Sequence, residues 1–229
     1  MASAKITEIF SSIQGEGLYV GEPQIFVRFS GCNLDCAFCD TVKKGGKEHG
    51  VVEILNAVDL LSGADAARTV VLTGGEPLLA VDFLRQLLPQ LKKRHYRIYL
   101  ETNGMLPGNL EKVLAMVDII AMDIKLPSAQ RGKGFWTLHR AFLNLAKSRK
   151  VFVKVVVTDA TTEDEIGKAS ALINDIDFRI PLVLQPVTPA NRIRKKVPAA
   201  RLLRFQSAAK KILHDVRIIP QVHKQLGMR

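Results

Sequence analysis

All three cysteines of the chain lie within eight residues, at Cys32, Cys36 and Cys39, in the spacing C-x3-C-x2-C. An odd number of thiols cannot form a disulfide framework, and the loops between these would be very short. Three thiolates can instead converge on one metal centre. Structural zinc sites need four ligands and iron–sulfur clusters usually have four cysteines, so three cysteines leave one position open. For a zinc site, the fourth ligand would be Asp40 or His49.

Polar residues also follow six predicted strands, each at the point where the strand ends. These segments are residues 73–77, 101–104, 123–125, 158–159, 185–188 and 220–223. Because the carboxyl ends of parallel strands open onto one mouth of an α/β fold, we expect the six segments to lie together. The pattern therefore predicts an active site at that mouth.

The elements that must position these residues alternate between strand and helix patterns. Apolar runs predict strands at residues 6–12, 25–29, 69–73, 97–102, 117–124, 150–158, 182–185 and 216–220. Helical spacing of apolar residues predicts helices at 54–61, 84–91, 110–116, 135–145, 166–173 and 202–213. The alternation favours parallel βαβ units, hence a barrel or an open α/β sheet. Residues 42–50, rich in Lys and Gly, are expected to form a flexible connection.

The composition favours one sizeable domain in a reducing compartment. The chain has 229 residues, 47% of them hydrophobic, but no apolar run long enough to span a bilayer. The first residues lack the features of a signal peptide, and three free thiols suit the cytoplasm. The net charge of +11 is interpreted first as solvated surface and second as a docking face for an acidic electron donor. Aromatic residues are not interleaved with the basic clusters, so a surface for single-stranded nucleic acid is not expected.

Two motifs together resemble those of the radical S-adenosylmethionine (SAM) superfamily. One is the cysteine motif, with Phe38 just before its last cysteine, and the other is the Gly74-Gly75-Glu76-Pro77 turn after a buried strand. The resemblance implies a [4Fe–4S] cluster held by Cys32, Cys36 and Cys39, with SAM bound to the open iron. It also implies that the reactive radical belongs to the cofactor, so we expect no catalytic side chain in the usual sense.

Further motifs resemble the 7-carboxy-7-deazaguanine synthase family nearly from end to end. They are residues 10–17, 26–28, 39–41, 73–77, 101–104, 122–128, 184–189 and 221–224. The family resemblance implies a lyase of queuosine or 7-deazapurine biosynthesis. The implied reaction is the Mg²⁺-dependent ring contraction of 6-carboxy-5,6,7,8-tetrahydropterin to 7-carboxy-7-deazaguanine, with loss of ammonia.

The resemblance also implies the architecture and the partners. The expected fold is a modified, incomplete TIM-like (β/α) barrel of the radical SAM type. It would form a single domain over residues 1–229, with the cluster loop at 31–41. A homodimer and an acidic flavodoxin- or ferredoxin-like electron donor are expected, with no membrane or direct nucleic-acid partner.

Site residues follow from the resemblance position by position. SAM is expected to contact Phe38, Cys39, Asp40, Gly75, Asp123, Ile124, Lys125, Gln185, Pro186, Val187 and Thr188. The pterin is expected to contact Ile13, Gln14, Gly15, Glu16, Arg28, Thr73 and His223, and Mg²⁺ the hydroxyl of Thr41. Asp123 stands where some members have serine, and the chain ends in Arg229, so the family's role for the chain terminus stays open.

Two other functions remain open on the sequence. A radical SAM activase that makes a glycyl radical on a partner protein would share the cysteine motif and the Gly-Gly-Glu-Pro turn. It would leave the residues at 14–17 and at 221–223 unexplained. A basic zinc-binding nucleic-acid module would explain the charge and the cysteines, but not six polar strand ends.

Overall fold

The structure is a computed structural model that describes residues 2–39, 45–65, 67–189 and 195–228. Its strands are β1 (Ser3–Ile13), β2 (Pro23–Phe29), β3 (Lys47–Gly50), β4 (Thr69–Gly74), β5 (Arg97–Thr102), β6 (Ile119–Asp123), β7 (Lys150–Val157), β8 (Leu182–Pro186) and β9 (Val216–Ile218). Its helices are α1 (Val51–Asp65), α2 (Val81–Lys93), α3 (Pro107–Glu111), α4 (Trp136–Ala146), α5 (Glu163–Asp177), α6 (Ala199–Lys210) and α7 (Val222–Gln225).

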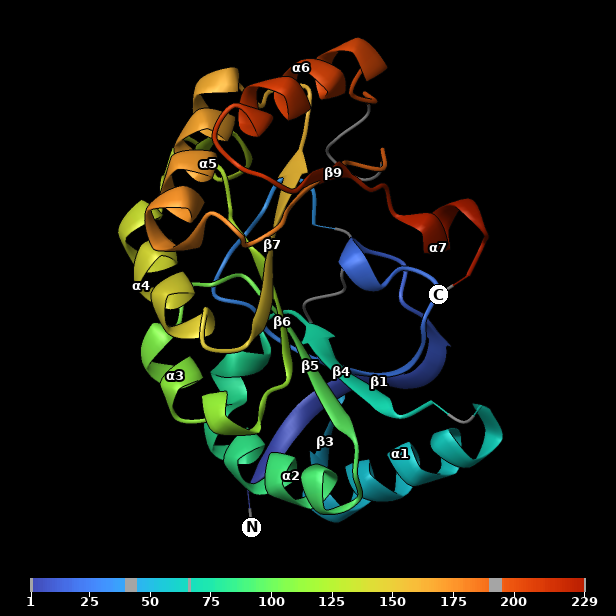
Figure 1. Cartoon of the computed structure of the whole chain (residues 1–229). Helices are drawn as coiled ribbons and strands as arrows, with labels where there is room; N and C mark the ends of the chain where they lie inside the picture. Colours follow the sequence, from blue (N-terminus) through green and yellow to red (C-terminus); the bar gives the residue numbers. More distant parts are fainter. Residues whose placement is uncertain (1, 40–44, 66, 190–194, 229) are drawn as a thin grey trace.

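All nine of these strands form one curved sheet in the order β3-β1-β2-β4-β5-β6-β7-β8-β9. Neighbouring strands from β2 to β9 are parallel, whereas β1 is antiparallel to both β2 and β3. In the described part of the chain β3 and β9 do not pair, so the sheet stays open. The helices α2 to α6 cover its outer side, and α7 lies at the mouth (Figure 1). The prediction of an incomplete (β/α) barrel is confirmed.

Apolar side chains fill both sides of the sheet. The larger cluster lies between the sheet and its helices and includes Val70, Leu84 and Ile173. A smaller cluster inside the curve contains Phe10, Phe26, Val71, Tyr99, Ile119, Ala121, Phe152 and Val183. The central strands are buried on both faces, which explains their nearly continuous apolar sequences. The inner cluster fills the bottom of the barrel, whereas polar residues line its mouth.

The structure corrects several predicted elements. Residues 47–50 are not a flexible connection but β3, an edge strand that pairs with β1. Its sequence, Lys-Glu-His-Gly, has no apolar alternation, because neither face of this edge strand packs on the core. The helix predicted at 110–116 is two short pieces, α3 and a 3₁₀ turn at Leu114–Met116. The short helices at Gly17–Tyr19 and in α7 were not predicted.

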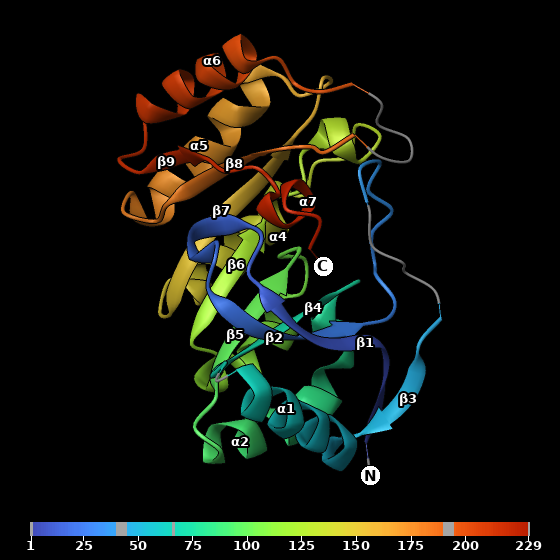
Figure 2. The same ribbon diagram turned by 90° about the vertical axis from the view of Figure 1, so that its right-hand side faces the viewer.

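Among the described residues, no helix is both long and apolar enough to cross a bilayer. The view in Figure 2 shows how α7 and the C-terminal end of the chain come close to β1 at the mouth of the barrel. A backbone hydrogen bond from Val222 N to Gly15 O, 2.9 Å, fixes this approach. Residues 222–228 therefore help to form the mouth of the barrel.

Candidate active site

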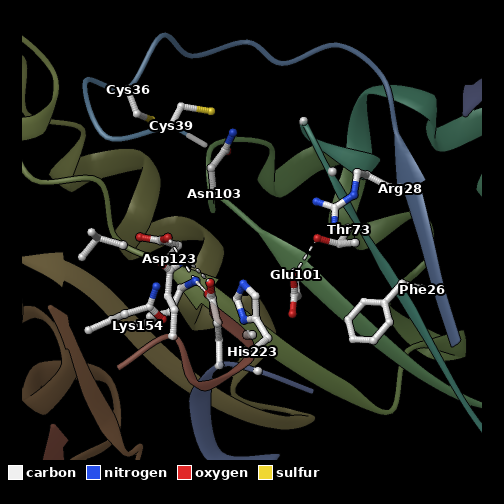
Figure 3. Close-up of a pocket in the computed structure, with 18 of the residues that line it drawn as sticks. Phe26, Arg28, Cys36, Cys39, Thr73, Glu101, Asn103, Asp123, Lys154 and His223 are labelled. Carbon is white, nitrogen blue, oxygen red and sulfur yellow. Dashed lines mark hydrogen bonds and ion pairs between the residues drawn. The ribbon is translucent and has the colours of Figure 1, made fainter. Parts of the chain in front are cut away.

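A cavity of about 740 Å³ occupies the mouth of the barrel, over the carboxyl ends of the parallel strands. It is in the size range of small-molecule sites. Figure 3 shows side chains from different strands pointing into it, among them Arg28, Thr73, Glu101, Asp123 and Lys154. Five of the six polar strand ends predicted to share one site contribute to this cavity. Residues 158–159 do not, because Thr158 is buried and bonded to Thr161 in the next turn.

Most of the predicted site residues line the cavity. They are Cys32, Cys36 and Cys39; Phe38, Gly75, Asp123, Lys125, Gln185, Val187 and Thr188; and Ile13, Gln14, Gly15, Glu16, Arg28, Thr73 and His223. Ile124 instead lies in the hydrophobic core, 1% exposed, and Pro186 is not part of the lining. Asp40 and Thr41 lie outside the described residues, so the structure does not place them.

The two glycines of the Gly-Gly-Glu-Pro turn let it pack directly against the cluster loop. Gly75 N donates to Phe29 O and Glu76 N to Gly31 O, each at 2.9 Å. A Cβ on Gly75 would lie 1.7 Å from Gly31 O, and Gly74 has a φ of +119°. Gly75 is therefore required by backbone contact with the cysteine loop, and Gly74 by its positive φ and its contact with the backbone of Phe29, before any contact with SAM.

Substituting Gly75 with alanine should displace the cluster loop. The new methyl group would overlap the Gly31 carbonyl, and backbone cannot yield as a flexible side chain does. We expect a loss of roughly 3 kcal/mol or more in stability and reduced iron incorporation, by thermal unfolding and iron analysis. Gly108→Ala is the matched control, because nothing lies within 4 Å of its Cβ position. Equal stability and iron content in both variants would contradict this packing role.

Glu76 joins the turn after β4 to the turn after β5. Its carboxylate accepts from Thr102 Oγ1 at 2.9 Å and from Asn103 N at 2.8 Å. Burial raises the pKa of Glu76 to about 7, although these hydrogen bonds and others partly oppose the shift. Asn103 in turn donates to Asn33 Oδ1 at 2.8 Å, and its carbonyl contacts His139 Nε2 at 3.2 Å. The two turns and the cysteine loop therefore form one connected unit.

A row of alternating charges crosses the cavity. Lys154 on β7 donates to Glu16 and lies 3.7 Å from Asp123 Oδ2, which also accepts from Lys125 at 2.7 Å. Gln221 donates to the other Glu16 oxygen at 2.7 Å. Burial alone would raise the pKa of Glu16, but Lys154 outweighs it and holds that pKa at about 2. Glu16 therefore stays ionised, and Lys154 links the predicted pterin and SAM regions.

Glu101 is a second carboxylate in the cavity. It accepts from Thr73 Oγ1 at 2.6 Å and from Gln14 Nε2 at 3.0 Å. Gln14 is 2% exposed, and its Oε1 accepts from Glu16 N. The side chain of Gln14 thus holds the carboxylate of Glu101 and the backbone of Glu16 in place at the wall of the cavity.

In Figure 3, Arg28 and His223 lie on opposite sides of Glu101. Arg28 Nε donates to Glu8 Oε2 at 3.0 Å, and its guanidinium lies over the Phe10 ring, 5.5 Å from the centroid. His223 packs against Gly15, where a Cβ would come within 2.0 Å of its Nδ1. Gly15 is therefore needed for α7 to close over the loop after β1.

Lys154 and Glu101 were missed as site residues, although each left a signal in the sequence. Lys154 interrupts the strongest apolar strand, as Arg28 does in β2, and Glu101 stands at a polar strand end. A single charge within an otherwise apolar strand indicates a side chain that points into a polar interior rather than into the core.

The polar atoms of the site fit a thiolate-bound cluster and a ligand rich in donors. Leu34 N and Gln130 Nε2 donate to the sulfurs of Cys32 and Cys36, at 3.4 and 2.7 Å. Within the described residues, Asp123 Oδ1 and Gln185 Oε1 are buried acceptors without a hydrogen-bond partner. The amino and hydroxyl groups of SAM can satisfy such acceptors.

A zinc site finds no support among the described residues, which do not include Asp40. Across the described residues no three Cys, His, Asp or Glu side chains converge closely enough to hold one metal ion. In a cluster, by contrast, each cysteine binds a different iron, so the sulfurs lie further apart than around zinc. His49, the described candidate for a fourth zinc ligand, lies on β3, 3.6 Å from Glu53.

Comparison with known proteins defines the class. The profile of the radical SAM superfamily matches residues 26–168, and the chain belongs to this superfamily. Membership implies a [4Fe–4S] cluster and SAM.

The relatives narrow the class further. A 7-carboxy-7-deazaguanine synthase of Geobacter sulfurreducens is 40% identical, over 98% of this chain and 97% of the relative. Another, of Methanothermobacter thermautotrophicus, is 38% identical over 99% and 98%. The crystal structure of QueE from Escherichia coli shares the fold, with a TM-score of 0.64, 23% identity and coverage of 96% and 95%. Within the superfamily, the chain is a member of the 7-carboxy-7-deazaguanine synthase family.

Proposed function

We propose that this protein is a 7-carboxy-7-deazaguanine synthase. It converts 6-carboxy-5,6,7,8-tetrahydropterin to 7-carboxy-7-deazaguanine and releases ammonia. The observation that carries the proposal is the single cavity, which brings the cysteine loop together with Glu16, Arg28 and Glu101. Relatives that carry this name and match nearly the whole chain support it.

One end of the cavity binds the cofactors. When bound, the reduced cluster and SAM supply the radical that starts the ring contraction. Cys32, Cys36 and Cys39 hold the cluster in this proposal. The buried oxygens of Asp123 and Gln185 accept hydrogen bonds from SAM, and Lys125 holds the Asp123 carboxylate in place.

The other end of the cavity orients the pterin. The guanidinium of Arg28 binds the substrate carboxylate, a pairing that Arg geometry favours. Glu16 and Glu101, both held by neutral or cationic donors, accept from the N–H groups along the pterin edge. His223 and the Phe10 and Phe26 rings close the sides of the site and exclude water.

Mg²⁺ is assigned to Thr41, with the substrate carboxylate and water completing its oxygen ligands. Thr41→Ala should leave the iron content unchanged while the activation of turnover by Mg²⁺ weakens at least tenfold. Thr41→Ser, which keeps the hydroxyl, is the control and should retain the response. A full Mg²⁺ response in the alanine variant would remove Thr41 from the site.

The remaining parts of the proposal concern the whole protein. It acts as a single radical SAM domain over residues 1–229, in the cytoplasm, where a reducing medium keeps its cysteines in the thiol form. It forms a homodimer, and an acidic flavodoxin- or ferredoxin-like protein docks on its basic surface to reduce the cluster.

Anaerobic turnover tests the proposed function. The reconstituted protein is incubated with SAM, reductant, Mg²⁺ and 6-carboxytetrahydropterin, and the products are identified by mass spectrometry. We expect 7-carboxy-7-deazaguanine and free ammonia. Cleavage of SAM with the pterin unchanged would overturn the substrate and retain the superfamily chemistry.

A further inference from the structure

The cluster loop is braced by the turn at residues 127–132, which follows β6. Ala37 N donates to Ala129 O at 3.2 Å, and Asp35 pairs with Arg131 at 3.3 Å. Between these contacts, Gln130 Nε2 donates to Cys36 Sγ at 2.7 Å. The turn thus contacts the loop on both sides of Cys36 and at its sulfur.

The contact between Gln130 and Cys36 is sheltered from water. Gln130 is 7% exposed and Cys36 is 8% exposed. A buried amide donor that lost this acceptor would be costly, so the contact is maintained. Because the local dielectric is low, a donor at this position acts strongly on the charge of the sulfur.

The turn is itself fixed, so the donor cannot easily move away. Gln130 N and Gly132 N both donate to Pro127 O at 2.9 Å. Ser128 N donates to Glu165 Oε1 at 2.6 Å, and Glu165 also closes the capping box of α5 with Thr162. The N-terminus of α5 therefore anchors the turn that carries Gln130.

We propose that Gln130 is a positioning residue that tunes the iron–sulfur cluster through Cys36. This rests on the assignment of Cys36 as a cluster ligand. An N–H group that donates to a ligating sulfur stabilises the extra negative charge of the reduced cluster and so raises its reduction potential. Gln130 thereby makes the cluster easier to reduce and holds Cys36 in place.

The sulfurs of Cys32 and Cys36 accept from different donors. Cys32 Sγ accepts from Leu34 N at 3.4 Å and from Asn103 Nδ2 at 3.9 Å, both longer contacts than that from Gln130. The donor to Cys36, the middle ligand of the motif, comes from a turn that is distant from it in the sequence.

The test is a redox titration of the reconstituted protein without pterin or SAM. Gln130→Met removes the donor and keeps a side chain of similar length. We expect iron and sulfide close to the wild-type values and a midpoint potential that is clearly more negative, read from the electron paramagnetic resonance signal of the reduced cluster. Arg131→Gln is the matched control, because it removes an exposed contact of the same turn but no donor to sulfur. A full cluster with an unchanged midpoint potential in Gln130→Met would overturn the proposal.

A second measurement covers the case in which Gln130→Met does not assemble a cluster. Wild-type protein labelled with ¹⁵N-glutamine is reduced. The magnetic coupling between the cluster and the side-chain nitrogen of Gln130 is then recorded by pulsed electron paramagnetic resonance. We expect a ¹⁵N coupling that disappears in Gln130→Glu, which lacks the side-chain nitrogen. Absence of that coupling from the wild-type protein would refute the contact. Neither readout involves the pterin, so both are independent of the proposed substrate.

Discussion

Replacing Lys154 with methionine should weaken productive pterin binding and leave the iron–sulfur cluster in place. Lys154 neutralises Glu16 and approaches Asp123, and its removal leaves two carboxylates in a confined site without their shared cation. Breaking one partner of a buried pair costs about 3–5 kcal/mol. Part of that loss should appear in substrate binding, as a KM for the pterin raised roughly a hundredfold, or about 2.7 kcal/mol.

The same variant should change how stability depends on pH. In the wild type, Lys154 holds the pKa of Glu16 at about 2, below its usual 4.5. The ionised carboxylate therefore contributes stability above pH 4.5, and this contribution is lost as the pH falls towards 2. Without Lys154, burial dominates and raises the pKa of Glu16 above 4.5. The folded variant then retains a proton on Glu16 as well as the one on Glu76, and the unfolded chain releases both. Its stability should therefore fall more than that of the wild type as the pH rises from 5 to 8.

Chemical denaturation at pH 5 and pH 8, with steady-state kinetics, measures both effects. Lys150→Met is the matched control, because Lys150 begins the same strand and its side chain is exposed. It should keep the wild-type KM and the wild-type pH profile of stability. A Lys154→Met variant with normal KM would show that Glu16 does not need this lysine to read the pterin.

Replacing Cys36 with alanine should give the opposite result, a folded protein without cluster or turnover. Two remaining cysteines cannot hold a [4Fe–4S] cluster in this loop, so iron, sulfide and the brown colour should all be lost. Cys36 is a small buried side chain, and its truncation should cost only about 1 kcal/mol of stability.

The control for Cys36→Ala is pterin binding by the apoprotein. Because Glu16, Glu101 and Arg28 are held by contacts that do not involve Cys36, the variant should retain most of its affinity for the pterin. A variant that keeps full iron content and turnover would exclude Cys36 as a cluster ligand.

Local patterns in the sequence predicted most of the elements and the edge of the sheet that carries the site. The polar ends of the strands, the three clustered cysteines and the alternation of strands with helices are local features, and each depends on residues close in the chain. Local patterns did not predict β3, whose polar residues have no apolar periodicity, or α7, which is too short to show such periodicity. The antiparallel pairing of β1 could not be predicted from its pattern, because strand direction depends on partners.

Interactions between distant residues were decided only by the tertiary structure. The pairing of Lys154 with Glu16 joins residues 138 positions apart, and the contact of Gln130 with Cys36 joins residues 94 apart. The structure also places Ile124 in the core, although the sequence predicted it as a ligand contact, and it joins Gln14 to the Glu101 carboxylate and to the backbone of Glu16. The chain by itself specified which chemical groups gather at the mouth of the barrel. The pairing of these groups, such as which lysine neutralises which carboxylate, depends on side-chain packing across the barrel. That packing leaves no local pattern in the sequence.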